Sequence, residues 1–132
     1  MMKRAVPIIY QSYVVHQTDE FKQTLGEAYA DLENMHGTAF ADKWHKAITH
    51  FIDSLEAPSS LGHIDPANFS DRYIARQISG TKTTIFFLVE QDQIYLVTSG
   101  YSVRNWRELL QKKEAALKHQ IEILKGRLDK SH

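Results

Sequence analysis

The sequence contains no cysteine, and this absence excludes a disulfide framework, a thiolate nucleophile and a thiolate metal site. The absence is compatible with the cytoplasm, where we expect the protein to be located. Long apolar runs are also missing, since no stretch approaches the ~20 apolar residues of a membrane-spanning helix. We therefore expect no membrane partner.

Basic residues precede an apolar patch in the N-terminal stretch MMKRAVPIIYQSYVV, as they do in a signal peptide. Pro7, Gln11 and Ser12 interrupt the patch, however, and no small-x-small cleavage site follows it. We interpret this stretch as a first β-strand, with Pro7 at a sheet edge or at the start of the strand.

Net charge is zero overall, but the charges are divided unevenly along the chain. Residues 1–71 contain 5 Lys/Arg and 10 Asp/Glu, whereas residues 72–132 contain 11 and 6, so the formal charges are −5 and +5. Such a division indicates that one half meets an anion, or that the halves meet each other or a partner. Chance segregation of charge on a solvated surface is an equal alternative.

The length and composition are typical of one globular domain spanning residues 1–132, and its first half predicts two helices. The first helix begins at Thr18-Asp19-Glu20 and ends at Gly37; its apolar residues are Phe21, Leu25, Ala28, Tyr29, Leu32 and Met35. Thr38 is suited to cap the second, whose apolar stripe is Phe40, Trp44, Ala47, Ile48, Phe51, Ile52 and Leu55. The short separation predicts an antiparallel hairpin.

After a loop at residues 57–70, the apolar residues follow the period of strands. Strands are expected over 71–79, 82–89 and 94–99, with Gly100 ending the last one. They form an antiparallel meander whose middle strand is buried. Asn105 and Glu108 mark the start of a final helix, which frays at Gly126. The predicted fold class is α+β: a small twisted antiparallel sheet, made of the meander plus the N-terminal strand, with the helical hairpin and the C-terminal helix on one face.

Motifs for metals and nucleotides are missing, so no cofactor is expected. His45 and His50 are five residues apart, whereas helical metal-binding pairs are three or four apart, and none of the seven histidines is expected in the sheet. Gly62 and Gly80 stand alone, which excludes a phosphate loop and a dinucleotide fingerprint.

Cations cluster around the predicted meander. If the end of the last strand lies beside the Ser79-Gly80 hairpin, then Arg76, Lys82 and Arg104 line one concave patch, together with Tyr101 or Trp106. Cationic side chains neutralise phosphates and aromatic rings stack on unpaired bases, so this combination suits single-stranded RNA. The alternative is that the cations protect a sheet edge from aggregation and that both aromatic residues belong to the core.

The order of elements, with the stretch DRYIARQISGTKTTIFFLVEQDQIYLVTSGYSVRNW, resembles the RelE/ParE superfamily of bacterial toxins. The resemblance extends from about Val6 to Leu124 and implies a toxin of a type II toxin–antitoxin system, with a cognate antitoxin as partner. In the RNA-cleaving members, ribosome-bound mRNA is cut without a metal. By resemblance, Arg76 and Lys82 would stabilise the phosphate and transition-state charge, Arg104 would act on the leaving-oxygen side, and Tyr101 or Trp106 would stack a base or transfer a proton.

Other cationic and aromatic side chains of this region are expected to bind the substrate: Arg72, Trp106, Arg107, Lys112 and Lys113. The ParE-like branch implies an alternative, a toxin without nuclease chemistry that inhibits DNA gyrase. A non-toxic interaction module on the same fold is a third possibility. In any toxin, we expect the antitoxin to cover the basic sheet and to displace or cover the final helix.

Overall fold

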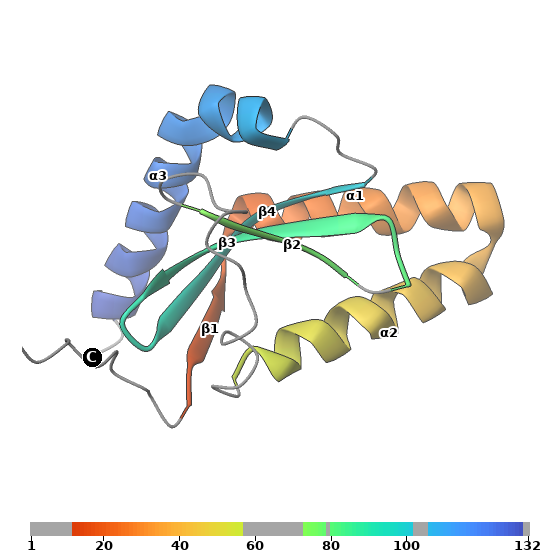
Figure 1. Ribbon diagram of the computed structural model, residues 1–132, viewed down its shortest axis with the longest axis horizontal. Helices are drawn as coiled ribbons and strands as arrows, with labels where there is room; N and C mark the ends of the chain where they lie inside the picture. Colours follow the sequence, from red (N-terminus) through yellow and green to blue (C-terminus); the bar gives the residue numbers. More distant parts are fainter. Residues whose placement is uncertain (1–11, 57–72, 79, 102–105, 131–132) are drawn as a thin grey trace, which may run out of the picture.

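The computed structural model describes residues 12–56, 73–78, 80–101 and 106–130 (Figure 1). The predicted order of strands and helices is confirmed. The elements are β1 (Val14–Gln17), α1 (Asp19–His36), α2 (Thr38–Ser54), β2 (Ile74–Gln77), β3 (Thr83–Glu90), β4 (Gln93–Tyr101) and α3 (Trp106–Lys130). The predicted loop at 57–70 lies outside the described residues, as do Pro7, Asn105 and most of the predicted first strand.

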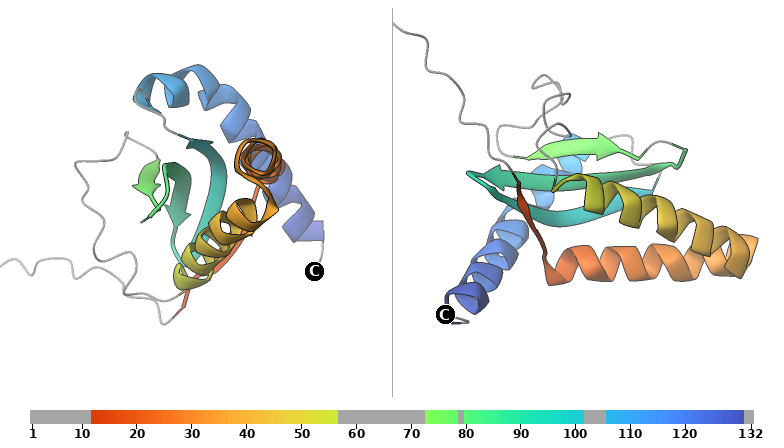
Figure 2. Two further views of the ribbon diagram at one scale, coloured as in Figure 1. Left: turned by 90° about the vertical axis from the view of Figure 1, so that its right-hand side faces the viewer. Right: turned by 90° about the horizontal axis from the view of Figure 1, so that it is seen from below.

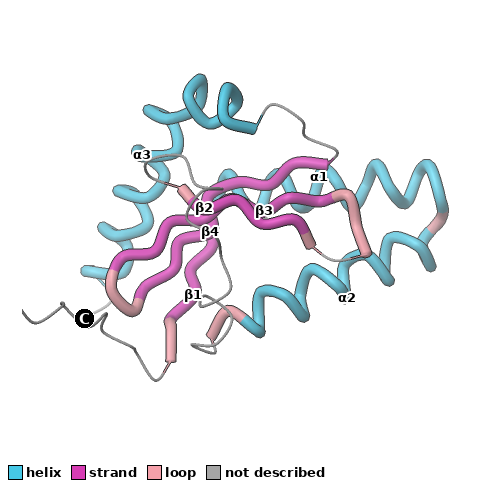
Figure 3. The backbone as a smooth tube through the Cα atoms, in the orientation of Figure 1, coloured by secondary structure: helices cyan, strands magenta, loops and turns pink. Residues whose placement is uncertain are grey.

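The four strands form one twisted sheet in the order β1-β4-β3-β2 (Figure 3). The predicted meander is confirmed, because β3 pairs antiparallel with both β2 and β4, and β3 is an inner, buried strand. The prediction of a fully antiparallel sheet is wrong, since β1 runs parallel to β4, with His16 opposite Tyr95. Parallel neighbours require a long connection, which the helical hairpin and the meander supply here.

Helices cover both faces of the sheet, so the prediction of helices on one face is wrong. Alternate residues of each strand belong to different cores. One core joins Ile85, Phe87 and Leu96 to residues of α1 and α2, and the other joins Phe86, Leu88 and Val97 to Leu110, Leu117 and Ile121 of α3. The inner strands β3 and β4 carry apolar residues on both sides, and this pattern requires a second covering layer.

Local signals fix the ends of the helical hairpin. The Thr18 hydroxyl accepts a hydrogen bond from the Phe21 N–H at 3.1 Å and caps α1, as predicted. Gly37 ends α1, also as predicted, with φ 90°. The predicted cap at Thr38 is wrong: Thr38 is the first residue of α2, and its hydroxyl donates to Glu33 on α1.

The closed end of the hairpin projects beyond the sheet (Figure 1 and the right-hand view of Figure 2). Met35 and Phe40 lie at this end and are 69% and 46% exposed, although the apolar pattern predicts that both are in the core. The physical reason is that the strands end before they reach these turns of the helices. The apolar period indicates which side of a helix faces the sheet, but not how far along the helix the sheet extends.

Two glycines lie inside elements rather than at their ends. Gly100 is part of β4, where it pairs with Thr84, so it does not end the strand as predicted. Gly126 is part of α3, which continues to Lys130 instead of fraying. One exposed glycine costs a helix only about 1 kcal/mol, and here Arg127 donates two hydrogen bonds to Asp19 of α1 that hold the following turn.

Candidate functional site

Arg76 lies on the edge strand β2 and faces the α1–α2 side of the sheet, as Ile74 and Ile78 also do. The carbon of its guanidinium group is 5.5 Å from the centroid of the Phe51 ring of α2. Arg76 is half-buried, and its charge therefore lies over an aromatic face at the boundary of the first core. The side of the strand on which Arg76 lies agrees with the alternation expected from the sequence, but its contact with Phe51 was not predicted.

Lys82 lies in the turn between β2 and β3 and is exposed. The turn closes through two backbone hydrogen bonds, from Ile78 N–H to the Thr83 carbonyl (2.9 Å) and from Thr81 N–H to the Ile78 carbonyl (3.0 Å). Gly80 has φ 78°, a backbone region that glycine adopts without strain. Lys82 belongs to this turn and not to the following strand, which begins at Thr83.

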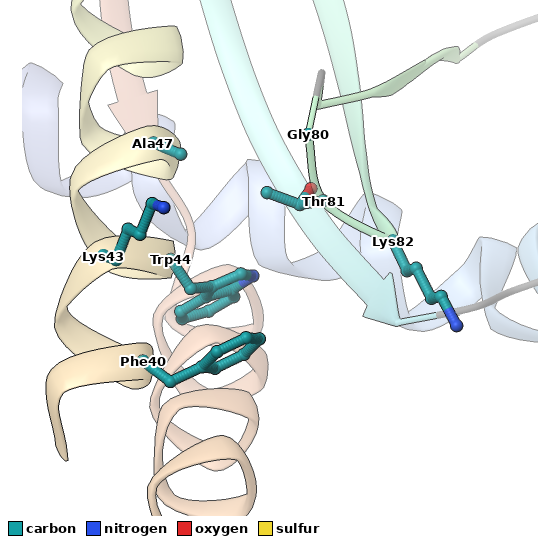
Figure 4. A pocket seen from close by; sticks show the side chains of 7 residues that line it. All are labelled: Phe40, Lys43, Trp44, Ala47, Gly80, Thr81 and Lys82. Atoms are coloured by element: carbon teal, nitrogen blue, oxygen red, sulfur yellow. The ribbon is translucent and has the colours of Figure 1, made fainter. Parts of the chain in front are cut away.

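A groove runs between α2 and this turn, and Lys82 lies at its rim (Figure 4). Its volume is about 610 Å³; we name it the α2–turn groove, lined by Phe40, Lys43, Trp44, Ala47, Gly80, Thr81 and Lys82. Lys43 and Lys82 lie on opposite sides of it, and the two aromatic rings come from successive turns of α2. The indole N–H of Trp44 donates to the Thr83 hydroxyl at 2.8 Å, which fixes α2 against the start of β3.

The residues predicted to form a catalytic patch are placed only in part. The backbone of Tyr101 is opposite Thr83 in the β3–β4 pairing, so the end of the last strand does lie beside the turn that carries Lys82. Arg72 and Arg104 lie outside the described residues, as do the side chains of Tyr101, Trp106 and Arg107. Arg76 is not among the residues of the α2–turn groove. The convergence of Arg76, Lys82 and Arg104 stays a prediction.

Three cations of α3 lie close to carboxylates of other elements. The Lys113 ammonium is 3.6 Å from Glu20 of α1, Lys125 is 2.7 Å from Glu90 of β3, and Arg127 forms its paired hydrogen bonds with Asp19. The hydroxyl of Thr98 also donates to Glu20, at 2.8 Å. Lys112 is exposed. The acidic first half and the basic second half of the chain therefore meet each other directly through Lys113 and Arg127, which is one of the explanations of the divided charge considered above.

A smaller hollow of about 460 Å³ lies between α1 and α2, lined by Gln17, Lys22, Leu25, Gly26, Tyr29, Asp42 and His45. Within it, the Tyr29 hydroxyl donates to Asp42 at 2.6 Å, and the His45 ring contacts the Tyr29 ring edge-on. The hydrogen bond to Asp42 raises the pKa of Tyr29 to about 12. This phenol is therefore harder to ionise than that of an ordinary tyrosine, whose pKa is 10.0.

One histidine does lie in the sheet, so the prediction of a sheet without histidine is wrong. His16 in β1 stacks on Tyr95 of β4 with ring centroids 5.2 Å apart, and it shares a hydrogen bond with Gln93. The Lys125 ammonium lies 5.4 Å from the centroid of the Tyr95 ring. Burial raises the pKa of Tyr95. His16 was missed because the predicted strand stopped one residue before it.

Among the described residues, no three His, Asp or Glu side chains lie together in a way that could hold a metal ion. None of the described helices is long and apolar enough to cross a membrane.

Comparisons with known proteins bear on the fold. No family profile matches the sequence, and no curated protein matches it significantly. Among solved structures, a chain described as "Chromosomal ParDE TA system from P. aeruginosa" superposes with a TM-score of 0.60 and 14% sequence identity. The alignment covers 70% of this chain and 98% of that chain. The fold is RelE/ParE-like. At this level of identity the likeness concerns the fold alone.

Sequence reasoning missed the α2–turn groove. The sequence pattern placed Phe40 and Trp44 on one apolar stripe of the second helix, without distinguishing their exposure. The signal that could have revealed the groove is the position of two aromatic residues four apart at the start of α2. The strands of the sheet end before they reach Phe40 at the closed end of the hairpin, so this part of the apolar stripe of α2 stays exposed.

Proposed function

We propose that this protein is the toxin of a type II toxin–antitoxin pair, acting in the cytoplasm and held inactive by a cognate antitoxin. The observation that carries this proposal is the fold match, which covers 98% of the ParDE chain and 70% of this chain. The resemblance of the sequence to the RelE/ParE superfamily, which rests on the order of elements, points to the same assignment.

The first candidate activity is metal-independent cleavage of ribosome-bound mRNA. In this reaction a ribose 2′-hydroxyl attacks the adjacent phosphate, the 2′-proton passes to a base, and the 5′-oxygen leaves with a proton. Arg76, Lys82 and Arg104 would stabilise the charge that builds on the phosphate oxygens, and Tyr101 would transfer a proton. The exposure of Lys82 and the backbone position of Tyr101 beside it support this assignment.

The second candidate activity is inhibition of a protein target such as DNA gyrase, without nuclease chemistry. Two observations favour it. The structural neighbour is described as a ParDE system. In addition, Arg76 packs over Phe51 whereas Lys82 borders the α2–turn groove, so these two cations have different surroundings.

Inducible expression in bacteria tests the proposal. A toxin is expected to arrest growth. Mapping of mRNA 5′ ends then separates the candidates, because a nuclease produces new ends within translated messages, whereas a gyrase inhibitor produces DNA damage and loss of supercoiling activity with intact messages. Normal growth at high expression of the folded protein would contradict the toxin assignment and favour the interaction module.

Single variants test the catalytic assignment. For a nuclease, Arg76→Ala, Lys82→Ala and Arg104→Ala are each expected to reduce cleavage by about 100-fold or more, since each removes charge stabilisation from the transition state. Lys46→Ala is the matched control, because Lys46 is an exposed lysine on α2 that does not line the α2–turn groove. Full cleavage by all three variants would show that the reaction takes place elsewhere.

A further inference from the structure

The α2–turn groove combines an apolar floor with two positive charges, and we propose that it seats a segment of the antitoxin in which carboxylates flank a bulky apolar side chain. This inference rests on the proposed function, because it names the surface and the chemistry of the expected partner. It places the contact at Phe40, Lys43 and Lys82, near the closed end of the helical hairpin.

The apolar part of the groove is available to a partner. Phe40 is 46% exposed, and its ring lies beside that of Trp44, which is only 5% exposed. Ala47 continues the lining along α2 and keeps the groove open because its side chain is small. An aliphatic or aromatic side chain placed against Phe40 would remove this surface from water, which is the main driving force of protein association.

The polar groups of the groove fit carboxylates better than a nucleotide base. The Trp44 N–H is bonded to Thr83, and the Thr81 hydroxyl donates to the Ile78 carbonyl while it accepts from the Thr83 N–H. The donor hydrogens of Trp44 and Thr81 are therefore already used within the protein and are not available to a base. Lys43 and Lys82 both line the groove. Their ammonium groups form no ion pair with any other described residue. Two ammonium groups on opposite sides of an apolar surface are complementary to a partner segment in which acidic residues flank an apolar residue.

Seating a segment here leaves α3 in place. Displacement of α3 would separate Arg127 from Asp19 and Lys113 from Glu20, and would expose the buried core around Leu117. Binding in the α2–turn groove avoids these costs and covers Lys82, which the first candidate activity uses. An antitoxin segment bound in the groove would therefore neutralise the toxin without displacing the final helix.

The test measures the affinity of the purified full-length protein for the antitoxin encoded beside its gene. Phe40→Ser and Lys43→Glu are each expected to raise Kd by about tenfold or more, because they remove the apolar anchor or reverse a complementary charge. Met35→Ser and Lys46→Glu are the matched controls: both residues are exposed on the same hairpin, neither lines the groove, and Kd should stay within about twofold. Thermal unfolding of each variant verifies that it is folded.

The outcomes separate this inference from the proposed function. If Phe40→Ser and Lys43→Glu bind the antitoxin as tightly as the unmodified protein, the groove is not the contact and the inference is overturned, although growth arrest would still support the toxin. If expression arrests no growth, the toxin assignment fails, and a groove-dependent Kd would still establish the docking surface. Amide exchange that slows on α2 and the β2–β3 turn supports the inference; exchange that changes only on α3 contradicts it.

Discussion

Gly37 is the residue on which the helical hairpin turns. Its φ of 90° and ψ of 165° belong to a region that is accessible essentially only to glycine. Its N–H donates to the Glu33 carbonyl at 2.8 Å and its carbonyl accepts from Ala41 at 3.2 Å, so it closes α1 and opens α2 at once. A side chain at this position would strain the backbone even though the surrounding space is open.

We therefore expect Gly37→Ala to lower the free energy of unfolding by about 1–3 kcal/mol, measured by urea denaturation. Gly126→Ala is the control, because this glycine lies within α3 with open space around it. That substitution should raise the free energy of unfolding by about 0.5–1 kcal/mol, since alanine is the better helix former. Equal stabilities of the two variants would contradict the strain at Gly37.

The pair of Asp19 and Arg127 predicts a dependence of stability on pH. The hydrogen bonds and the charge of Arg127 lower the pKa of Asp19 below its ordinary value of 3.8. A lowered pKa in the folded state means that the carboxylate stabilises the fold at pH values above 3.8, and that this contribution is lost as the pH falls through the lowered pKa.

Asp19→Asn is accordingly expected to have a lower Tm than the unmodified protein at neutral pH, and the difference should shrink as the pH falls below 3.8. Thermal unfolding followed by circular dichroism over a pH series measures it. The double variant with Arg127→Gln should be no less stable than Asp19→Asn alone. A difference in Tm that persists unchanged in acid would argue against the ion pair.

At the scale of elements, α3 supplies the helical side of the second core, in which Leu117 packs with Phe86 and Val97. Leu117 is completely buried between this helix and the sheet, whereas Leu128, one of the last residues of the helix, is only half-buried. We expect Leu117→Ala to lower the free energy of unfolding by about 2–5 kcal/mol, because it leaves a cavity in the core. Leu128→Ala should cost clearly less, and urea denaturation compares the two. A similar cost for both would mean that α3 packs loosely.

The extent of sequence-based prediction differs between local and distant features. Thr18 and Gly37 bound α1 because capping and left-handed backbone are properties of a few neighbouring residues. The meander follows equally from its two short turns. The partner of β1 and the face covered by α3 could not be predicted, because they depend on which apolar surfaces meet in space, and both faces of β3 are equally apolar.

The candidate site likewise combines features that the local sequence predicts with features that depend on packing. The alternation of side chains in β2 predicts correctly which residues share a face with Arg76, and the turn predicts the proximity of Lys82 to the end of β4. The contact of Arg76 with Phe51 and the position of Phe40 at an open groove depend on how α2 lies across the sheet. That placement is set by packing over the whole domain, and no local pattern encodes it.

At the scale of the whole molecule, the acidic and basic halves of the chain are joined by α3. A chain that ends at residue 105 would lack the cations that face Asp19 and Glu20, and it would expose apolar residues of the second core such as Phe86 and Val97. We expect this truncated chain to bind a hydrophobic dye and to aggregate. A chain that ends at residue 130 retains α3 and is the control, which should remain monodisperse in size-exclusion chromatography.

The parallel pairing of β1 with β4 has a consequence for how the protein is made. His16 and Gln93, which meet in this pairing, are 77 positions apart, so the N-terminal strand leaves the ribosome long before its neighbour exists. At roughly 5–20 residues per second, several seconds of translation separate the two. During that interval the nascent hairpin presents Trp44, Ile48 and Phe51 to water, because the strands that later bury them have yet to be synthesised. The growing polypeptide is therefore open to capture by chaperones before it can acquire any activity.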